Sequence, residues 1–370
     1  MGTFFDSIVR PDECRKRVEQ IKRLSTHLTV IYGAGVYARE VTDFLNKYSV
    51  AVAGYVVDES YADQPQVGGI RADRLGRADD LFGPFYLVLG FCGDPYRSVA
   101  KLKAMNFKKL LGTQIIDCRF WRRFERLSND YLSEHREAFE ALYAGLEDDM
   151  SRRILVAFLR AKMMFDPTPL RTFFSPCHYF PDDLPLFRPK KSDVFIDGGA
   201  FTGDTLARVL SLTDGQGCAE YYAFEPDERN AAHLRCYIEA NGLRSVRMIR
   251  QGLWSRKELM RFQSGEDSRS LICESGNAEI DADRLDLLGR PATFIKMDLE
   301  GAEIEALKGA EQTIKTHTPK LAVAVYHRLE DLTVVPTYLR SLCPDYRFYL
   351  RIHSLFSEEM VLYAVVRSSQ

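Results

Sequence analysis

The segment that decides the fold is Val194-Phe-Ile-Asp-Gly-Gly-Ala-Phe-Thr-Gly-Asp-Thr205. A short apolar run ends at Asp197, and the glycines Gly198, Gly199 and Gly203 follow before a helical pattern begins. Glycines at such a strand end let the backbone turn sharply and approach a ligand, and a carboxylate there can meet a cation or an amine. A tight turn from strand to helix without a ligand explains the segment equally well when it is taken alone.

A second acidic strand end follows in the run Tyr221-Tyr-Ala-Phe-Glu-Pro-Asp227. Glu225 ends the predicted strand, where a carboxylate accepts hydrogen bonds from both ribose hydroxyls of a bound nucleoside. A nicotinamide nucleotide fits this arrangement too. The structural alternative is a helix start, in which Pro226 occupies the first helical position and the acid is stabilised by the helix dipole.

A third strand end is the richest in charge, Phe294-Ile-Lys-Met-Asp-Leu-Glu-Gly-Ala-Glu303. Lys296 and Asp298 are two positions apart, so both side chains lie on one face of the predicted strand. A lysine inside a buried parallel strand is costly unless it is paired. We therefore prefer a ligand-binding loop here over a merely charged helix start, in which Glu300 and Glu303 would only favour the dipole.

The C-terminal region, residues 190–370, alternates strand and helix patterns, which is typical of an α/β domain with a mostly parallel sheet. The connection between the last two strands is too short for a helical crossover, so these strands are predicted to pair as a hairpin and the last to be antiparallel. The predicted strands are 194–197, 221–225, 246–251, 294–298, 321–326, 346–351 and 360–366.

The N-terminal region, residues 1–118, is predicted to be a smaller Rossmann-like domain. The strand Leu28–Tyr32 precedes Gly33, Gly35 and Ala38, and Asp58 ends the next strand, which fits the dinucleotide fingerprint. This pattern suggests an NAD-dependent oxidoreductase or epimerase, although the sequence has no Tyr-x-x-x-Lys pair for hydride transfer. A domain used only for packing or dimerisation is an equally good interpretation.

Residues 119–189 are predicted to be a helical connector followed by a proline-punctuated extended lead-in. Their role as a substrate lid, a dimer interface or a spacer stays open, and the sequence is compatible with a homo-oligomer.

The composition is that of an ordinary soluble globular protein of two or three domains, with 370 residues, 46% hydrophobic and 28% charged. The formal net charge is -2, so no broad cationic field is available for nucleic acid, and we expect no nucleic-acid partner. Eight scattered cysteines without a C-x-x-C pair predict reduced thiols. We expect neither a signal peptide nor a membrane span, and hence a cytoplasmic protein.

The C-terminal motifs resemble those of the FkbM-type methyltransferases, from about residue 177 onward. The motifs that recur in order are Asp197-Gly-Gly-Ala-Phe-Thr-Gly-Asp-Thr205, Ala223-Phe-Glu-Pro-Asp227, Phe294-Ile-Lys-Met-Asp-Leu-Glu-Gly-Ala-Glu303, Ala306-Leu-Lys-Gly-Ala310, Pro319-Lys-Leu321 and Val325-Tyr-His327. The resemblance implies a class I S-adenosylmethionine-dependent methyltransferase that acts on a hydroxyl of a sugar, a nucleotide sugar or a related natural product. The N-terminal region is similar to the small Rossmann-like domain of sugar O-acyltransferases, which implies a nucleotide or nucleotide-sugar ligand there.

The resemblance also implies the roles of individual residues. The loop from Asp197 to Gly203 should hold the methionine part of the cofactor, Glu225 the ribose, and the segment 250–253 the adenine. Two residues depart from the family pattern. Phe201 stands where the family commonly has a small or polar residue in this loop. Gln251 stands where a carboxylate would accept a hydrogen bond from the adenine amine. The full set of expected cofactor-binding residues is Tyr179, Asp197, Gly198, Gly199, Ala200, Gly203, Asp204, Thr205, Glu225, Pro226, Gln251, Gly252 and Asp298.

The expected catalytic residues are Asp298, Glu300, His327 and Lys296. Methylation of an alcohol needs a base near the methyl group. Of His327 and Asp298, His327 has the more suitable unperturbed pKa for this role. The alternative is that His327 is a structural histidine. Arg351 and His353 share a strand face and are expected either to bind an anionic part of the substrate or to form a solvated edge. A divalent metal held by Asp298, Glu300, His327 and His353 is a further alternative.

Overall fold

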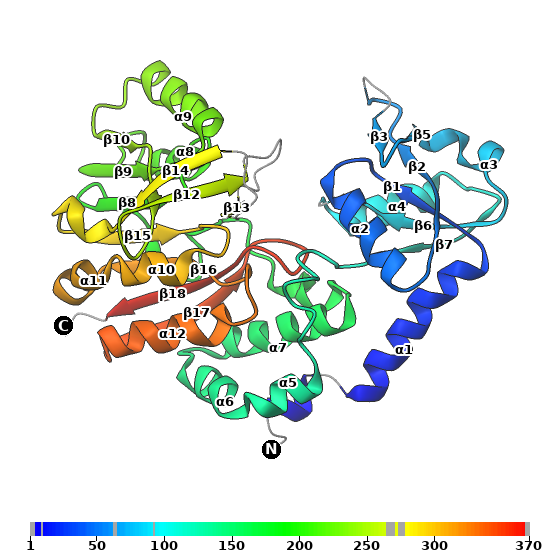
Figure 1. Cartoon of the computed structure of the whole chain (residues 1–370), viewed down its shortest axis with the longest axis horizontal. Coiled ribbons are helices and arrows are strands. Elements are labelled where there is room, and N and C mark those ends of the chain that lie inside the picture. The colour runs from blue at the N-terminus through cyan, green and yellow to red at the C-terminus, as the bar shows by residue number, and fades with distance from the viewer. Residues whose placement is uncertain are drawn as a thin grey trace. The chain divides into compact units, whose positions relative to one another are not determined.

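The computed structural model describes residues 4–8, 10–61, 65–91, 93–263, 271–272 and 278–366 (Figure 1). The chain forms two compact units. Unit 1 comprises Met1–Arg136, Arg153–Phe174 and Ser354–Glu358, and unit 2 comprises Glu137–Arg152, Ser175–His353 and Glu359–Gln370. Among the described residues, no helix is both long and apolar enough to cross a membrane.

Unit 1 contains a five-stranded parallel sheet with the strand order β5-β2-β1-β6-β7. The order reverses between β1 and β6, so the turn after β1 lies beside the end of β6. The strands are β1 (Leu28–Tyr32), β2 (Val52–Val57), β5 (Asp73–Arg74), β6 (Phe85–Leu89) and β7 (Leu110–Gln114), with a small hairpin of β3 (Gln66–Val67) and β4 (Ile70–Arg71).

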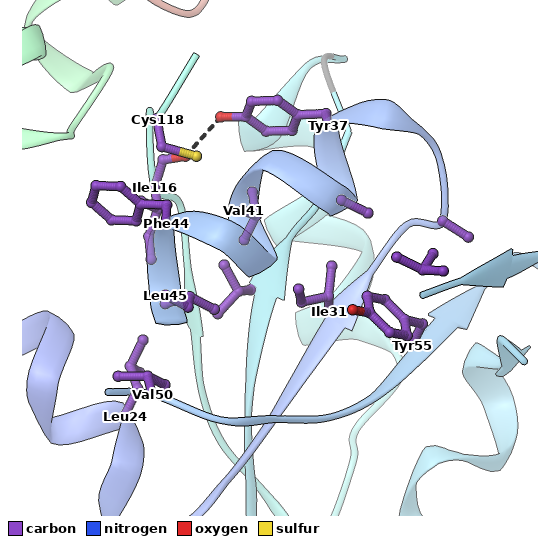
Figure 2. Close-up of a cluster of buried hydrophobic side chains, with 14 of the residues drawn as sticks. Leu24, Ile31, Tyr37, Val41, Phe44, Leu45, Val50, Tyr55, Ile116 and Cys118 are labelled. Carbon is purple, nitrogen blue, oxygen red and sulfur yellow. Dashed lines mark hydrogen bonds between the residues drawn. The ribbon is translucent and has the colours of Figure 1, made fainter. Parts of the chain in front are cut away.

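The core of unit 1 is built on α2 (Val36–Lys47), which follows the glycine turn. Its buried residues recur every three to four positions, as expected for an amphipathic helix packed on a sheet: Tyr37, Ala38, Val41, Phe44 and Leu45. Figure 2 shows this helix face beside Ile31. The Tyr37 hydroxyl donates a hydrogen bond to the Ile116 carbonyl, and the two oxygen atoms are 2.7 Å apart. The tyrosine therefore buries its ring without leaving its hydroxyl unsatisfied.

The remaining helices of the first half of the chain are α1 (Pro11–Lys22), α3 (Ala78–Leu81), α4 (Pro95–Ala104), α5 (Asn129–Glu134), α6 (Arg136–Gly145) and α7 (Asp149–Met164). Proline occupies the first positions of α1 and α4, where its missing N–H costs no hydrogen bond.

Unit 2 contains a seven-stranded sheet with the order β10-β9-β8-β15-β16-β18-β17. Neighbouring strands are parallel except that β18 is antiparallel to both β16 and β17, which confirms the predicted mostly parallel sheet. The strands are β8 (Val194–Gly198), β9 (Glu220–Phe224), β10 (Val246–Ile249), β15 (Phe294–Met297), β16 (Lys320–Ala324), β17 (Tyr346–Ile352) and β18 (Met360–Val366).

Stacked aromatic rings hold the centre of this sheet. The Phe195 ring lies 5.0 Å from that of Tyr221 and 4.7 Å from that of Phe294, because these residues are paired on three adjacent strands. The helices of unit 2 are α8 (Asp204–Leu212), α9 (Glu228–Ala240), α10 (Glu303–Lys308), α11 (Glu311–His317) and α12 (Asp331–Leu342). The packed sheet and its helices fix the positions of the strand ends that carry the polar residues.

A second sheet in unit 2 is not among the sequence predictions. It has the order β11-β14-β12-β13, with β11 (Gly252–Leu253), β12 (Glu258–Gln263), β13 (Leu271–Ile272) and β14 (Ala278–Asp283). Its described buried apolar side chains are Leu253, Met260, Ile280 and Ala282. Its strands are only two to six residues long, and β12 (Glu-Leu-Met-Arg-Phe-Gln) does not alternate strictly, so the sequence gives little strand signal there.

The described cysteines are free thiols, as predicted: Cys14, Cys118, Cys177, Cys218, Cys236 and Cys343. Cys92 and Cys273 lie outside the described residues.

Candidate active site

Unit 2 contains a cavity of about 290 Å³ at the carboxyl ends of its central strands. Because these ends meet at one edge of a parallel sheet, loops that are far apart in sequence converge there. The lining residues come from the glycine loop, the ends of β9 and β15, and the lead-in before β8: His178, Tyr179, Gly199, Phe201, Asp204, Phe224, Glu225, Pro226, Asn230, Gln251, Gly252, Leu253, Ile280, Lys296, Asp298, Leu299, Glu300, Ala302, Tyr326 and Glu359.

Eight of the thirteen expected cofactor-binding residues line this cavity. They are Tyr179, Gly199, Asp204, Glu225, Pro226, Gln251, Gly252 and Asp298. The other five, Asp197, Gly198, Ala200, Gly203 and Thr205, belong to the adjoining strand end, loop and first turn of α8. His178, Asn230, Tyr326 and Glu359 line the cavity without having been among the expected site residues, and Phe201 lines it from within the loop expected to hold the methionine part.

The glycine loop makes a close approach that a side chain would prevent. Gly199 has φ 75°, and a Cβ added there would stand 2.0 Å from the carbonyl oxygen of Asp298. The backbone N–H groups of Gly199 and Ala200 both donate to the carbonyl of Phe224. The loop is thereby fixed to the ends of β9 and β15 at once.

Lys296 is buried in β15, and its side chain binds the glycine loop. Its ammonium lies 3.1 Å from the Asp197 carboxylate and donates to the carbonyls of Gly198 at 3.1 Å and Gly199 at 2.6 Å. Burial lowers the pKa of Lys296, but Asp197 and Asp298 outweigh it, so the pKa is raised. The group stays protonated, and this favours a positioning role over that of a base.

Glu225 sits at the end of β9 and is 5% exposed. Its two carboxylate oxygens accept the backbone N–H groups of Phe201 at 2.8 Å and Asp227 at 2.9 Å. Burial raises its pKa to about 7 in spite of these hydrogen bonds. The carboxyl group is thus fixed in place, lines the cavity and titrates near neutral pH.

Asp298 follows β15 and is held by an aromatic side chain from the lead-in. The Tyr179 hydroxyl donates to its Oδ2 at 2.5 Å, and Nε2 of His327 lies 3.5 Å from its Oδ1. Burial raises the pKa of Asp298, but the charges of His327 and Lys296 outweigh burial and the pKa is lowered. Asp298 therefore presents an ionised carboxylate to the cavity.

His327, expected as the base, is fully buried behind Asp298. Its Nδ1 lies 2.8 Å from Oε1 of Glu303, and Nε2 lies 3.7 Å from Glu300. Burial lowers its pKa, but Glu303 and Glu300 outweigh burial and raise the pKa to about 10. A protonated imidazole has no lone pair for the acceptor proton, so this geometry favours a positioning role, unlike the role expected from the sequence.

Glu303 belongs to the third acidic motif of the sequence but was not among the expected site residues. Its fully buried Oε1 accepts the Leu299 backbone N–H at 2.8 Å and faces His327. It thereby fixes the loop that carries Asp298 and Glu300, in which Glu300 has φ 55°. The signal in the sequence was an acid in the first turn after the Asp298 motif.

Arg351 and His353 are engaged elsewhere in unit 2, in contrast to their expected role with substrate. The Arg351 guanidinium is 4% exposed and pairs with Asp148 at 2.8 Å and Asp183 at 2.7 Å. The His353 ring lies 2.9 Å from the carbonyl of Ser175 and 2.8 Å from the Tyr363 hydroxyl. Both side chains are therefore engaged in contacts within unit 2, and neither is among the described residues that line the cavity.

The expected metal set is not brought together either, because the His353 ring nitrogens face Ser175 and Tyr363. The described residues that approach one another closely enough to share an ion are His178, Asp298 and Glu359, and separately Asp298, Glu303 and His327.

In unit 1 the glycine turn has the expected shape. Gly33 has φ 133°, and a Cβ there would stand 2.4 Å from the Gly90 carbonyl oxygen. Asp58, however, accepts a hydrogen bond from the Tyr32 hydroxyl at 2.8 Å and pairs with Lys101. The chain's own groups thus occupy the carboxylate that the fingerprint assigns to a ribose, while Gly35 and Ala38 lie at the start of α2.

Comparison with known proteins supports the resemblance in the C-terminal half. Residues 197–351 match the model of the Methyltransferase FkbM domain. The matched range begins at Asp197 and spans the strand ends that form the cavity. This match indicates a methyltransferase domain over these residues. No curated protein matches the chain.

The fold is similar to solved methyltransferase structures. Methyltransferase FkbM from Methylobacillus flagellatus KT matches with a TM-score of 0.70 and 24% identity, covering 97% of this chain and 94% of that chain. An rRNA methylase from Streptococcus thermophilus has a TM-score of 0.33 and 15% identity, over 49% of this chain and 90% of that chain. Aeropyrum pernix fibrillarin, solved with natively bound S-adenosyl-L-methionine, has a TM-score of 0.32 and 14% identity, over 50% of this chain and 71% of that chain. The fold is that of the class I methyltransferases.

Proposed function

We propose that the chain is an S-adenosylmethionine-dependent O-methyltransferase that acts on a hydroxyl of a sugar or a similar small polyhydroxylated molecule. The observation that carries this proposal is the meeting of three groups around one cavity: the glycine loop at Gly199, the carboxyl group of Glu225 and the ionised carboxylate of Asp298. Each follows a different parallel strand of the same sheet.

The lining contains both apolar residues, such as Leu253 and Ile280, and five acids, which suits the different chemistry of the two ends of the cofactor. We assign Glu225 to the ribose hydroxyls, and the wall with Gln251, Leu253 and Ile280 to the adenine. The acids near Lys296 suit the positive charges of the methionine part. When bound, the cofactor supplies an electrophilic methyl group on a sulfonium.

The acceptor hydroxyl is assigned to the acidic part, beside Asp298. Methyl transfer needs the oxygen aligned with the methyl group and its proton removed as the bond forms. Asp298, held by Tyr179 and ionised, can accept that proton, and His327 and Lys296 keep the carboxylate charged. Lys296 is the one lysine or arginine among the described lining residues, so the lining favours an uncharged part of the acceptor over a phosphate here.

The test is calorimetric titration of the full chain with S-adenosylmethionine and, separately, with NAD. We expect S-adenosylmethionine to bind, and Glu225→Ala to weaken it by roughly 100-fold through the loss of two hydrogen bonds to a charged group. Glu228→Ala is the matched control, because that side chain is 82% exposed and lies at the start of α9, three residues after Glu225. Binding of NAD alone, unchanged in Glu225→Ala, would overturn the proposal in favour of an oxidoreductase that uses unit 1.

A further inference from the structure

Three metal-binding side chains from distant parts of the sequence meet on the wall of the cavity. His178 precedes β8, Asp298 follows β15 and Glu359 precedes β18. One ligand atom of each lies within 4.8 Å of the other two, and all three residues line the cavity. Imidazole and carboxylate together are ligands that divalent first-row metals prefer in proteins.

The His178 ring is held in one orientation by its neighbours. It stacks on Tyr179 with ring centroids 3.8 Å apart and lies 4.9 Å from the His353 ring. Its Nε2 is 3.1 Å from Oε2 of Glu359, is buried, and has no hydrogen-bond partner among the described residues. A buried ring nitrogen that faces a carboxylate oxygen without hydrogen-bond geometry is the arrangement expected of two ligands of one cation.

The charge of the cavity also suits a cation. Its described lining has one lysine and five acids, namely Asp204, Glu225, Asp298, Glu300 and Glu359. The alternative set of Asp298, Glu303 and His327 is less suitable, because Glu303 and His327 are fully buried and already bond to each other through Nδ1.

From this geometry we infer that His178, Asp298 and Glu359 bind one divalent cation at the acceptor side of the cavity. The inference rests on the proposed function only for the cation's use: the cation would bind an acceptor hydroxyl and favour loss of its proton to the carboxylate oxygen of Asp298 that does not bind the cation. The protein would supply three ligands, which leaves further positions of the cation for oxygen atoms of the acceptor or water.

The test uses manganese alone, added to the full chain without cofactor and followed by electron paramagnetic resonance. We expect one Mn²⁺ per chain, a nitrogen modulation from one imidazole, and displacement by excess Mg²⁺. His178→Ala and Glu359→Gln should each weaken binding by roughly tenfold or more, since each removes one of three ligands or its charge. His317→Ala, an exposed histidine of the same unit, is the matched control and should bind normally.

Three results would overturn the inference: no Mn²⁺ bound by the wild-type chain, bound Mn²⁺ without nitrogen modulation, or binding that His178→Ala leaves unchanged. The nitrogen signal is read on the wild-type protein, so the test does not depend on a variant that folds. Titration with S-adenosylmethionine in a chelator separates the two proposals. Cofactor binding without Mn²⁺ binding removes the metal site alone, and Mn²⁺ binding without cofactor binding removes the proposed function alone.

Discussion

The two units contain the same local pattern, and only one of the two copies opens onto a described cavity lined with acids. In unit 1 the turn after β1 contains Gly33 and an acid, Asp58, follows β2; in unit 2 the turn after β8 contains Gly199 and Glu225 follows β9. In each turn a glycine with positive φ lies against a carbonyl oxygen of the neighbouring strand end, from Gly90 in the first case and Asp298 in the second.

The two acids differ in what holds them. Glu225 is nearly buried and accepts two backbone N–H groups, and no ion pair holds its carboxyl group among the residues that the structure describes. Asp58 is 39% exposed and is paired with the ammonium of Lys101, which lies on α4. A fingerprint in the sequence therefore predicts the turn, whereas the partners of the acid decide whether a nucleoside can use the carboxylate.

The largest expected effect comes from filling the glycine positions. Gly199→Ala places a Cβ against the Asp298 carbonyl at a positive φ, so the loop must move, and we expect roughly 100-fold weaker S-adenosylmethionine binding. Gly33→Ala meets a similar contact in unit 1 and should lower its stability while leaving cofactor affinity unchanged. Calorimetry and urea unfolding of both variants measure this. Equal losses of S-adenosylmethionine affinity in the two variants would contradict the assignment of cofactor binding to unit 2 alone.

A smaller effect concerns the pH dependence of nucleoside binding. Burial raises the pKa of Glu225 to about 7, so its carboxyl group is protonated below that pH and accepts ribose hydrogen bonds less well. We expect binding to be about tenfold weaker at pH 6 than at pH 8. The ligand for this titration is 5′-methylthioadenosine, which lacks the titrating amine of the methionine part.

Glu225→Gln is the control for that titration, because it keeps the shape of the side chain without its charge. Its affinity should be nearly independent of pH over the same range. An unchanged pH dependence in Glu225→Gln would assign the titration to another group.

The smallest effect is expected at Asp58. The side chains of Asp58 and Lys101 are 39% and 47% exposed, so solvent screens their ion pair. Asp58→Asn should change the free energy of unfolding of unit 1 by less than about 1 kcal/mol and leave S-adenosylmethionine affinity unchanged. Titration with NAD and with a nucleotide sugar sharpens the comparison, since a loss of either in Asp58→Asn would identify unit 1 as a second nucleotide site.

The sequence predicts the parts of the fold that are marked by a local pattern within one strand or turn. Phe195 lies in the apolar run 194–196, and Phe294 stands beside Ile295 in a strand whose one charged residue is Lys296; such apolar segments are typical of parallel strands buried on both faces and identify the central sheet. The glycine turn and Glu225 are likewise local features of strand ends. The strands β12 and β14 were missed because β12 places Leu259 beside Met260 and so does not alternate, and the alternation of β14 contains one large apolar residue, Ile280.

The parts that were not predictable depend on contacts between distant segments. Alternation places Arg351 on a strand face, but the acids that neutralise it, Asp148 and Asp183, are far away in sequence and carry no local mark. The same holds for His327, whose surroundings of Glu303 and Glu300 reverse the protonation expected for a free imidazole. Sequence spacing names the titratable groups, and only the packing sets their charge.

The position of β18 also has a consequence for synthesis on the ribosome. This strand pairs with both β16 and β17, so the sheet of unit 2 cannot be completed before residues 360–366 have been made. Unit 1 includes Ser354–Glu358, and Phe356 is buried in its core. Most of unit 1 is translated first, but neither unit can be completed until residues 354–366 have been made. A nascent chain that lacks it exposes apolar surface and an unpaired strand edge, which are the features that chaperones bind.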